Sequence, residues 1–464
     1  SLENEFSKVI GDYYSRKKIT KILETIDELS QLKELQFINH KISETLVGEG
    51  VEVKIEIYEG QKFTIERINI SGNSVTNDSV IRGELIVDEG DPYSALLVTK
   101  SLNRLKARGI FSTVEKTLKE GSSADLKILE IKVTEKATGE ISAGAGVGTD
   151  GTSFMFGVSE NNWLGRGINL RSTLNVSADT LRGGIAVINP NFNYTGNSVN
   201  ASFDLSSTDL SSTSGYESSK TGISLGTEFE QYRNIFFGTA LSASFEDIEA
   251  KSSASDQIKK MEGNFSNIDF FYNITADYRN QVFQPTAGYR ARFTQSLPIY
   301  QDSSSILNGF DFSKYHGFSE DVIGAAKFYS RAIHGVDNDV RLSSRLYMPQ
   351  NRLRGFNIRK VGPTDGGDWI GGNYLTTLGL EAQLPNLLPE STRTDVSLFL
   401  DSGNLWGVDY SDTIDSSNKL RSAFGITANV FTTVGPLSFT LAQDIAKNTN
   451  DETETFNFRL GTSF

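Results

Sequence analysis

Polar and apolar residues alternate along most of the chain, from about Thr138 to its end. Residues 199–205, 237–246 and 289–294 show this pattern clearly, with an apolar side chain at every second position. Such segments recur about every 20 residues and are separated by turn clusters such as Asn189-Pro190-Asn191. Because successive side chains of a strand point to opposite faces of a sheet, the pattern predicts a long series of strands, each with one apolar face.

The length of the segments favours a membrane barrel over a soluble sandwich, which would also alternate. Several segments reach about ten residues, the length of a tilted membrane strand, whereas soluble strands average about five or six. Since lipid offers the backbone no hydrogen-bond partners, only a closed sheet can cross it with strands. At about 20 residues per segment, residues 137–464 predict an all-β transmembrane barrel of about 16 antiparallel strands. Aromatic residues gather near the strand ends, as in the girdles of such barrels: Phe154, Phe156, Trp163, Phe192, Tyr194, Phe236, Phe270, Phe271, Tyr272, Phe456 and Phe464.

Composition argues against several other classes of protein. The net charge is -13 and the pI is near 5.0, so the chain lacks the basic footprint that nucleic-acid binding requires. Cysteine is absent, and no apolar run approaches the length of a membrane helix. The three histidines, His40, His316 and His334, lie outside any recognisable nucleophile or metal-ligand spacing. We therefore expect no enzyme, no metal and no cofactor.

The first part of the chain mixes helices and strands in two similar passages. Residues 14–35 carry apolar residues at helical spacing, and residues 51–57 alternate as a strand. A later helix follows Tyr93-Ser94, and another alternating strand runs over residues 126–133. Corresponding residues of the two passages lie 76 to 79 positions apart, and such a period indicates tandem α+β domains. We assign them to residues 1–61, incomplete at the N-terminus, and to residues 62–136.

One long loop of the barrel carries an arginine that we expect to bind inside the lumen. The loop spans residues 336–371 and contains the motif Leu353-Arg354-Gly355-Phe356. Strand parity places Glu381 and Asp401 on the polar faces of two later strands, although Phe399 shares the parity of Asp401. Two carboxylates in a confined lumen call for a cation, and a bidentate arginine fits them best. A solvated loop arginine is the alternative, and the pattern does not show which arginine binds the carboxylates.

The first and last predicted strands must pair with each other to close the barrel. The first, residues 139–149, carries glycine on one face, and glycine weakens the interior of a strand. The last, residues 455–464, carries large apolar residues on one face. Either the corner is simply crowded, or the seam is weak and its strand edges can open and pair with another chain. The residues concerned are Gly144, Gly146, Gly148, Phe456, Phe458, Leu460 and Phe464.

The loop motif resembles that of the BamA family of outer-membrane assembly factors, which is usually Val/Ile-Arg-Gly-Phe. Leu353 departs from the motif but keeps its apolar character. The N-terminal repeats are similar to POTRA domains, the periplasmic modules that precede such barrels. The terminal Phe464 resembles the family's C-terminal aromatic residue. Further stretches that agree with the family are Asn161–Gly165, Asp277–Asn280, Val361–Pro363, Gly371–Asn373, Leu400–Trp406 and Val434–Leu437.

The resemblance implies α+β POTRA domains in the periplasm followed by a 16-stranded barrel in the bacterial outer membrane. It implies that Arg354 docks inside the barrel against Glu381 and Asp401. The implied function is the folding and insertion of β-barrel proteins into that membrane, without nucleotide, by strand pairing at a lateral gate and at POTRA edges. The implied partners are unfolded β-barrel clients, accessory periplasmic lipoproteins and outer-membrane lipid. Because this loop lacks the cysteines of some relatives, packing and ion pairs must hold it.

Two other functions share part of this architecture. A two-partner secretion pore has POTRA domains, a barrel and a similar loop, but generally carries tyrosine after Arg-Gly, where this chain has Phe356. A passive porin would leave the POTRA-like repeats without a purpose. We therefore favour an assembly factor over either pore.

Overall fold

The computed structural model describes residues 63–460 apart from short gaps at 150, 283, 303, 320, 337, 390–393, 412, 415–418 and 433–434. Before residue 63 it describes residues 38–47, residues 50–59 and isolated positions between 6 and 26. The chain divides into two compact units. The first comprises residues 1–138 and 161–167, and the second comprises residues 139–160 and 168–464.

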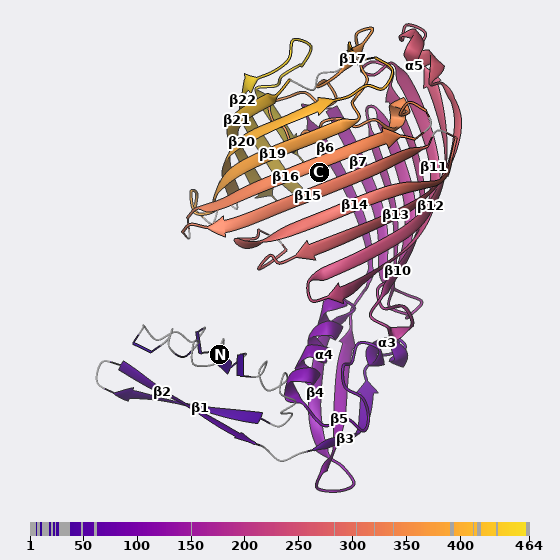
Figure 1. Cartoon of the computed structure of the whole chain (residues 1–464). Coiled ribbons are helices and arrows are strands. Elements are labelled where there is room, and N and C mark those ends of the chain that lie inside the picture. The colour runs from indigo at the N-terminus through magenta and orange to yellow at the C-terminus, as the bar shows by residue number, and fades with distance from the viewer. Residues whose placement is uncertain are drawn as a thin grey trace. The chain divides into compact units, whose positions relative to one another are not determined.

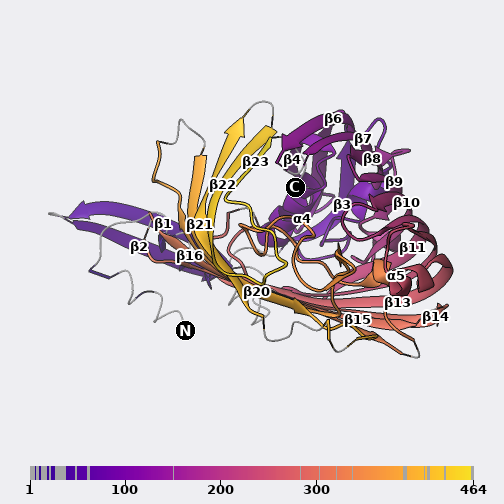
Figure 2. The ribbon, with the colours of Figure 1, turned by 90° about the horizontal axis from the view of Figure 1, so that it is seen from above.

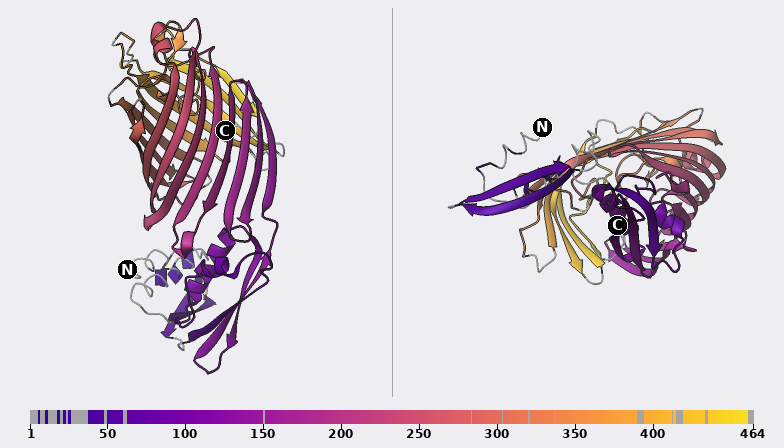
Figure 3. Two further views of the ribbon diagram at one scale, coloured as in Figure 1. Left: turned by 90° about the vertical axis from the view of Figure 1, so that its right-hand side faces the viewer. Right: turned by 90° about the horizontal axis from the view of Figure 1, so that it is seen from below.

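The second unit is a closed antiparallel barrel of sixteen described strands, which confirms the predicted fold (Figure 1). Neighbours in the barrel are neighbours in sequence, and the last strand, β23, returns to pair with the first, β6. Figure 3 shows the tilted strands of one wall side by side. The strands are β6 (Gly139–Gly148), β7 (Gly151–Trp163), β8 (Ile168–Ser177), β9 (Thr180–Asn189), β10 (Ser198–Leu210), β11 (Tyr216–Tyr232), β12 (Ile235–Ala250), β13 (Gly263–Asp277), β14 (Ala287–Gln301), β15 (Ser305–Gly317), β16 (Ile323–Gly335), β19 (Tyr374–Leu384), β20 (Thr394–Trp406), β21 (Arg421–Thr432), β22 (Gly435–Ala446) and β23 (Phe456–Leu460).

The outer face of the barrel is apolar because the alternating pattern turns its large side chains outward. On β11, for example, Ile223 and Leu225 are 57% and 58% exposed, while the intervening Ser224 pairs through its hydroxyl with Ser202 on the neighbouring strand. Many other apolar side chains are exposed in the same way along the barrel strands. So large an exposed apolar surface is what contact with lipid requires of a membrane barrel.

A long segment between β16 and β19 enters the ring of strands (orange, Figure 2). It runs over residues 336–373 and contains the 3-10 helix η2 (Leu342–Ser344) and the short strands β17 (Thr364–Asp365) and β18 (Asp368–Trp369). We call it the lumen loop. Together with α5 (Asp256–Lys260) it contributes to a buried apolar cluster of Leu210, Tyr216, Ile248, Ala254, Ile258, Leu342, Ile370 and Val408.

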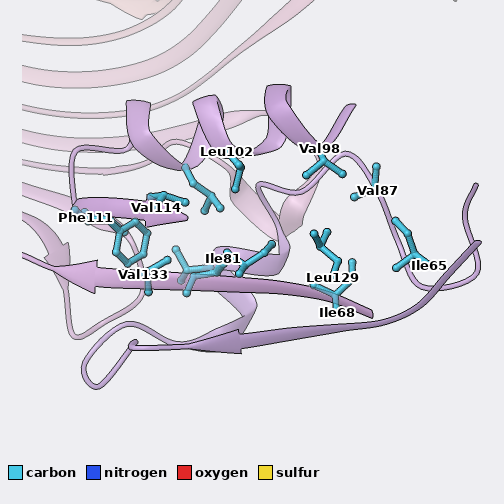
Figure 4. Close-up of a cluster of buried hydrophobic side chains, with 14 residues drawn as sticks. Ile65, Ile68, Ile81, Val87, Val98, Leu102, Phe111, Val114, Leu129 and Val133 are labelled. Carbon is cyan, nitrogen blue, oxygen red and sulfur yellow. The ribbon is translucent and has the colours of Figure 1, made fainter. Parts of the chain in front are cut away.

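The first unit contains a three-stranded sheet covered by two helices. Its order is β3-β5-β4, with β3 parallel and β4 antiparallel to β5. Apolar side chains between sheet and helices form one core (Figure 4). Ile65, Ile81 and Ile131 in this core are fully buried. The elements are β3 (Thr64–Ser71), α3 (Asp78–Arg82), α4 (Ala95–Ala107), β4 (Phe111–Glu120) and β5 (Leu126–Glu135). No described helix of the chain is long and apolar enough to cross a membrane.

The carboxylate of Glu135, at the end of β5, is held by a turn that follows β3. It accepts hydrogen bonds from the backbone N–H groups of Ser74, Val75 and Thr76 at 2.9, 3.0 and 2.6 Å. Burial alone would raise the pKa of Glu135, but these donors outweigh it and lower the pKa to about 2. Gly72 permits the close approach, because a Cβ there would lie 1.9 Å from the carbonyl oxygen of Val133.

The sequence predicted the elements before residue 63 incompletely. The predicted strand at residues 51–57 lies in β2 (Gly50–Glu59), but its partner β1 (Ile38–Val47) was not predicted. Most of the predicted helix at residues 14–35 lies outside the described residues. The described positions Ile19, Ile22 and Ile26 within it are buried.

Candidate functional site

Arg354 of the lumen loop lies against two carboxylates of the barrel wall. Its Nε is 2.7 Å from Oδ2 of Asp401, and its Nη2 is 2.9 Å from Oδ1 of the same residue. Nη2 also lies 2.9 Å from Oε1 of Glu381. The backbone N–H of Arg354 donates to Asp401 at 3.1 Å. The structure therefore brings together the arginine and the two carboxylates that the sequence singled out.

Two wall residues that the sequence did not assign complete this ion-pair cluster. Lys327 on β16 donates to Oε2 of Glu381 at 2.6 Å, so Glu381 lies between two cations. Phe399 on β20 faces inward with Asp401, and its ring centre lies 3.8 Å from the Arg354 guanidinium carbon. Phe399 is apolar and yet faces the lumen, as its parity with Asp401 indicated, because its ring forms a cation–π contact with the docked arginine.

The residues around Arg354 fix the loop by packing. Leu353 and Phe356 are almost fully buried in an apolar cluster with Val361, Leu375 and other residues. Gly355 has φ = +87°, and a Cβ there would lie 2.8 Å from the Cβ of Ala442 on β22. Only glycine satisfies both conditions without strain. The apolar neighbours anchor the loop, and the glycine lets its backbone approach the wall.

The lumen loop also pairs with the segment that leads into β23. The N–H of Glu454 donates to the carbonyl of Gly355, and the N–H of Asn357 donates to the carbonyl of Glu452, both at 3.0 Å. The Nζ of Lys360 lies 2.8 Å from the Glu452 carboxylate. Docking of Arg354 is therefore coupled through backbone hydrogen bonds to the start of the last strand.

A fully buried ion pair, Arg421 with Asp451, stabilises the same region and was missed by the sequence analysis. The Nε and Nη2 of Arg421 donate to the two Asp451 oxygens at 2.9 and 3.1 Å. Oδ1 of Asp451 also accepts from the N–H of Gly362 in the lumen loop at 3.1 Å. Asp451 lies in the polar run Asn448–Asp451, which reads as an exposed turn, so only the three-dimensional contact reveals it.

The seam between β6 and β23 has little pairing among the described residues. Register pairs join Arg459 to Gly148 and Leu460 to Val147, whereas β6 and β7 pair over ten positions from Gly139–Glu160 to Gly148–Gly151. At the same end of the seam, the N–H of Thr149 donates to the carbonyl of Phe458 at 3.2 Å, and Nδ2 of Asn457 donates to the Thr149 hydroxyl at 2.5 Å. Figure 2 shows β23 and β6 as neighbours where the ring closes.

The seam glycines differ in their surroundings. Gly144 and Gly146 lie opposite Met155 and Ser153 of β7. Gly148 lies at the seam itself, where a Cβ would be 2.6 Å from the carbonyl oxygen of Phe458. Phe464 lies outside the described residues. The described residues contain no cluster of three or more His, Cys, Asp or Glu side chains placed to hold a metal ion.

Fold and site together define a transmembrane β-barrel whose lumen holds an arginine-docked loop, preceded by an α+β domain. Family models match both parts: the Omp85 superfamily domain over residues 162–464 and the POTRA model, described as surface antigen variable number repeat, over residues 63–136. The chain belongs to the Omp85 superfamily. The barrel, the POTRA domain and the bacterial outer-membrane relatives described below give its location, the bacterial outer membrane, with the POTRA domain in the periplasm.

Curated relatives show which family within the superfamily the chain resembles. The chain is 25% identical to "Outer membrane protein assembly factor BamA" of Neorickettsia risticii over 89% of its own length and 57% of the relative's. It is also 25% identical to the protein of that name from Neisseria meningitidis, over 100% and 64% of the two lengths. The chain thus spans about three-fifths of these relatives. The predicted resemblance to the BamA family is confirmed.

Among solved structures, the chain resembles BamA from Haemophilus ducreyi lacking POTRA domains 1–3. The TM-score is 0.78 at 22% identity, with 100% of this chain and 97% of that chain covered. CdiB from Acinetobacter baumannii has the same general fold, with a TM-score of 0.59 at 11% identity over 97% and 83% of the two chains. These likenesses concern the fold, and the first is the closer of the two.

Proposed function

We propose that this chain folds β-barrel proteins and inserts them into the outer membrane. The names of its relatives, outer membrane protein assembly factor, support this role. The observation that carries it is the seam, where, among the described residues, two register pairs join β6 to β23, against ten between β6 and β7 and ten between β20 and β21. Weak closure leaves strand edges available to a client, and an open edge templates strand addition.

The proposed partners follow from this mechanism. Unfolded outer-membrane β-barrel clients pair with the seam edges and with the edge strands β3 and β4 of the POTRA sheet. Accessory periplasmic lipoproteins bring clients to the barrel, and outer-membrane lipid receives them. The work consists of strand exchange, so we propose that no catalytic group and no nucleotide takes part.

A two-partner secretion pore remains the alternative proposal, because CdiB shares the fold. Phe356 favours the assembly factor, since it is the residue that the BamA loop motif has after Arg-Gly. In this chain Phe356 is buried against the barrel wall, where the hydroxyl of a tyrosine would need a partner. The passive porin receives no support from any relative considered above.

A crosslink across the seam tests the proposal. The chain has no cysteine, so the pair Val147→Cys and Leu460→Cys, at a register position of β6 and β23, introduces one disulfide. We expect the oxidised protein in liposomes to lose its ability to fold a urea-denatured barrel client, followed by the heat-modifiable shift of the client on a gel. Reduction should restore this activity.

A matched pair within the first hairpin controls for the crosslink itself. Ala145→Cys with Phe154→Cys joins β6 to β7, which need not separate, and should leave client folding unchanged. Full activity of the oxidised seam variant would contradict strand pairing at the seam. Transport of a secreted partner by the same liposomes, without client folding, would favour the secretion pore.

A further inference from the structure

A second arginine of the lumen loop, Arg341, lies against another part of the barrel wall, on β12 and β13. Its side chain is only 7% exposed, and its guanidinium carbon lies 4.6 Å from the ring centre of Phe265. Nη2 donates to Oδ1 of Asn267 on β13 at 3.0 Å. Oε2 of Glu246 lies 3.7 Å from Nη1, too far for a hydrogen bond.

Arg341 is less completely bonded than Arg354. Its Nε and Nη1 are buried and make no hydrogen bond to any described residue, and the same holds for the Ser343 hydroxyl two positions later. Arg354, by contrast, directs Nε and Nη2 to carboxylate oxygens. Buried donors without partners are costly, so a ligand that accepts from them is favoured.

Arg341 and Ser343 line a lumen cavity of about 380 Å³ that carries excess positive charge. Its charged lining comprises Arg182, Lys220, Arg341 and Arg359 against Glu246 and Asp269, four cations to two carboxylates. Asp269 already accepts a hydrogen bond from Gln301, and Glu246 accepts one from Ser218. Charges act more strongly on one another inside a protein than in water, so the excess attracts an anion.

We infer that this cavity binds an oxyanion of the phosphate class. Guanidinium groups and hydroxyls are the donors that phosphate prefers, and the cavity presents both. Such an anion would join Arg341 and Arg359 of the lumen loop to Arg182 on β9 and Lys220 on β11. The loop, which Arg354 fixes to β19 and β20, would thereby gain a further attachment on β9 and β11.

Titration of the full chain in a non-ionic detergent tests the site. Sodium phosphate is added at constant ionic strength, with chloride as the balancing salt, while calorimetry follows binding and the unfolding temperature is recorded. We expect saturable binding and a raised unfolding temperature with phosphate but not with chloride. Arg341→Gln and Lys220→Gln should each weaken phosphate binding about tenfold, because each removes a charge-assisted contact.

Arg171→Gln is the matched control, since Arg171 on β8 does not line the cavity, and this variant should bind phosphate as the parent does. A second arm uses micelles containing phosphatidic acid. Stabilisation by these micelles alone, lost in both variants, would show that a lipid headgroup supplies the phosphate. The inference would be overturned if neither phosphate nor the phosphatidic acid micelles bound, or if Arg341→Gln and Lys220→Gln kept the affinity of the parent. Because Lys220→Gln leaves the lumen loop unchanged, this variant separates lost binding from lost folding.

Discussion

At the scale of single residues, Arg354 is the side chain on which the lumen depends most. Arg354→Ala leaves Asp401, 1% exposed, without its cation, while Glu381 keeps Lys327. Breaking a buried pair from one side costs about 3–5 kcal/mol. We expect a clear fall in the unfolding temperature of the barrel and slower client folding. Arg354→Lys should recover only part of the loss, because an ammonium cannot bind Asp401 at two points.

The neighbouring Arg352 provides the control for this residue. Its Nη2 lies 3.5 Å from Oδ1 of Asp311, and its side chain is 27% exposed. Arg352→Ala should therefore change the unfolding temperature little. Equal stability of the Arg354→Ala variant and the parent would show that the docked arginine does not stabilise the barrel.

The sequence indicated some of these residues and not others for a physical reason. Strand parity was enough to predict that Glu381 and Asp401 face inward, because parity depends only on neighbours along one strand. Arg421 begins β21 and Asp451 lies 30 positions later, between β22 and β23, and no local pattern encodes a contact between them. Lys327 was missed for the same reason, since its partner Glu381 lies 54 positions away on the next strand.

At the scale of elements, the turn after β3 depends on the charge of Glu135. Its pKa falls from 4.5 to about 2 in the folded protein, so its contribution to stability is complete above about pH 4.5 and is lost as the pH falls towards 2. We expect the unfolding temperature of the POTRA unit to decrease over this interval, measured by calorimetry on the full chain. Glu135→Gln should reduce that decrease, whereas Glu115→Gln, on the exposed part of β4, should not.

Elements were predicted where apolar residues keep the period of a strand or a helix along the whole element. The barrel strands, β5 and α4 meet this condition, and the predicted strands at residues 139–149 and 126–133, for example, lie close to the observed β6 and β5. β4 does not, since only Phe111 and Val114 of its ten residues are buried and the remainder are largely charged or hydroxyl side chains. β4 is a strand because it pairs with the edge of β5, a tertiary contact that its own sequence does not show.

At the scale of the whole molecule, the two units are held by separate apolar clusters. The cluster around Ile131 lies within the POTRA unit, and those around Leu342 and Leu405 lie within the barrel. Units with separate cores unfold separately, so we expect two transitions in calorimetry. Ile131→Ala should lower the temperature of the POTRA transition by an amount equivalent to about 2–5 kcal/mol and leave the barrel transition in place. Leu405→Ala should lower the barrel transition and leave the POTRA transition in place. A single transition that moves in both variants would mean that the two units fold as one.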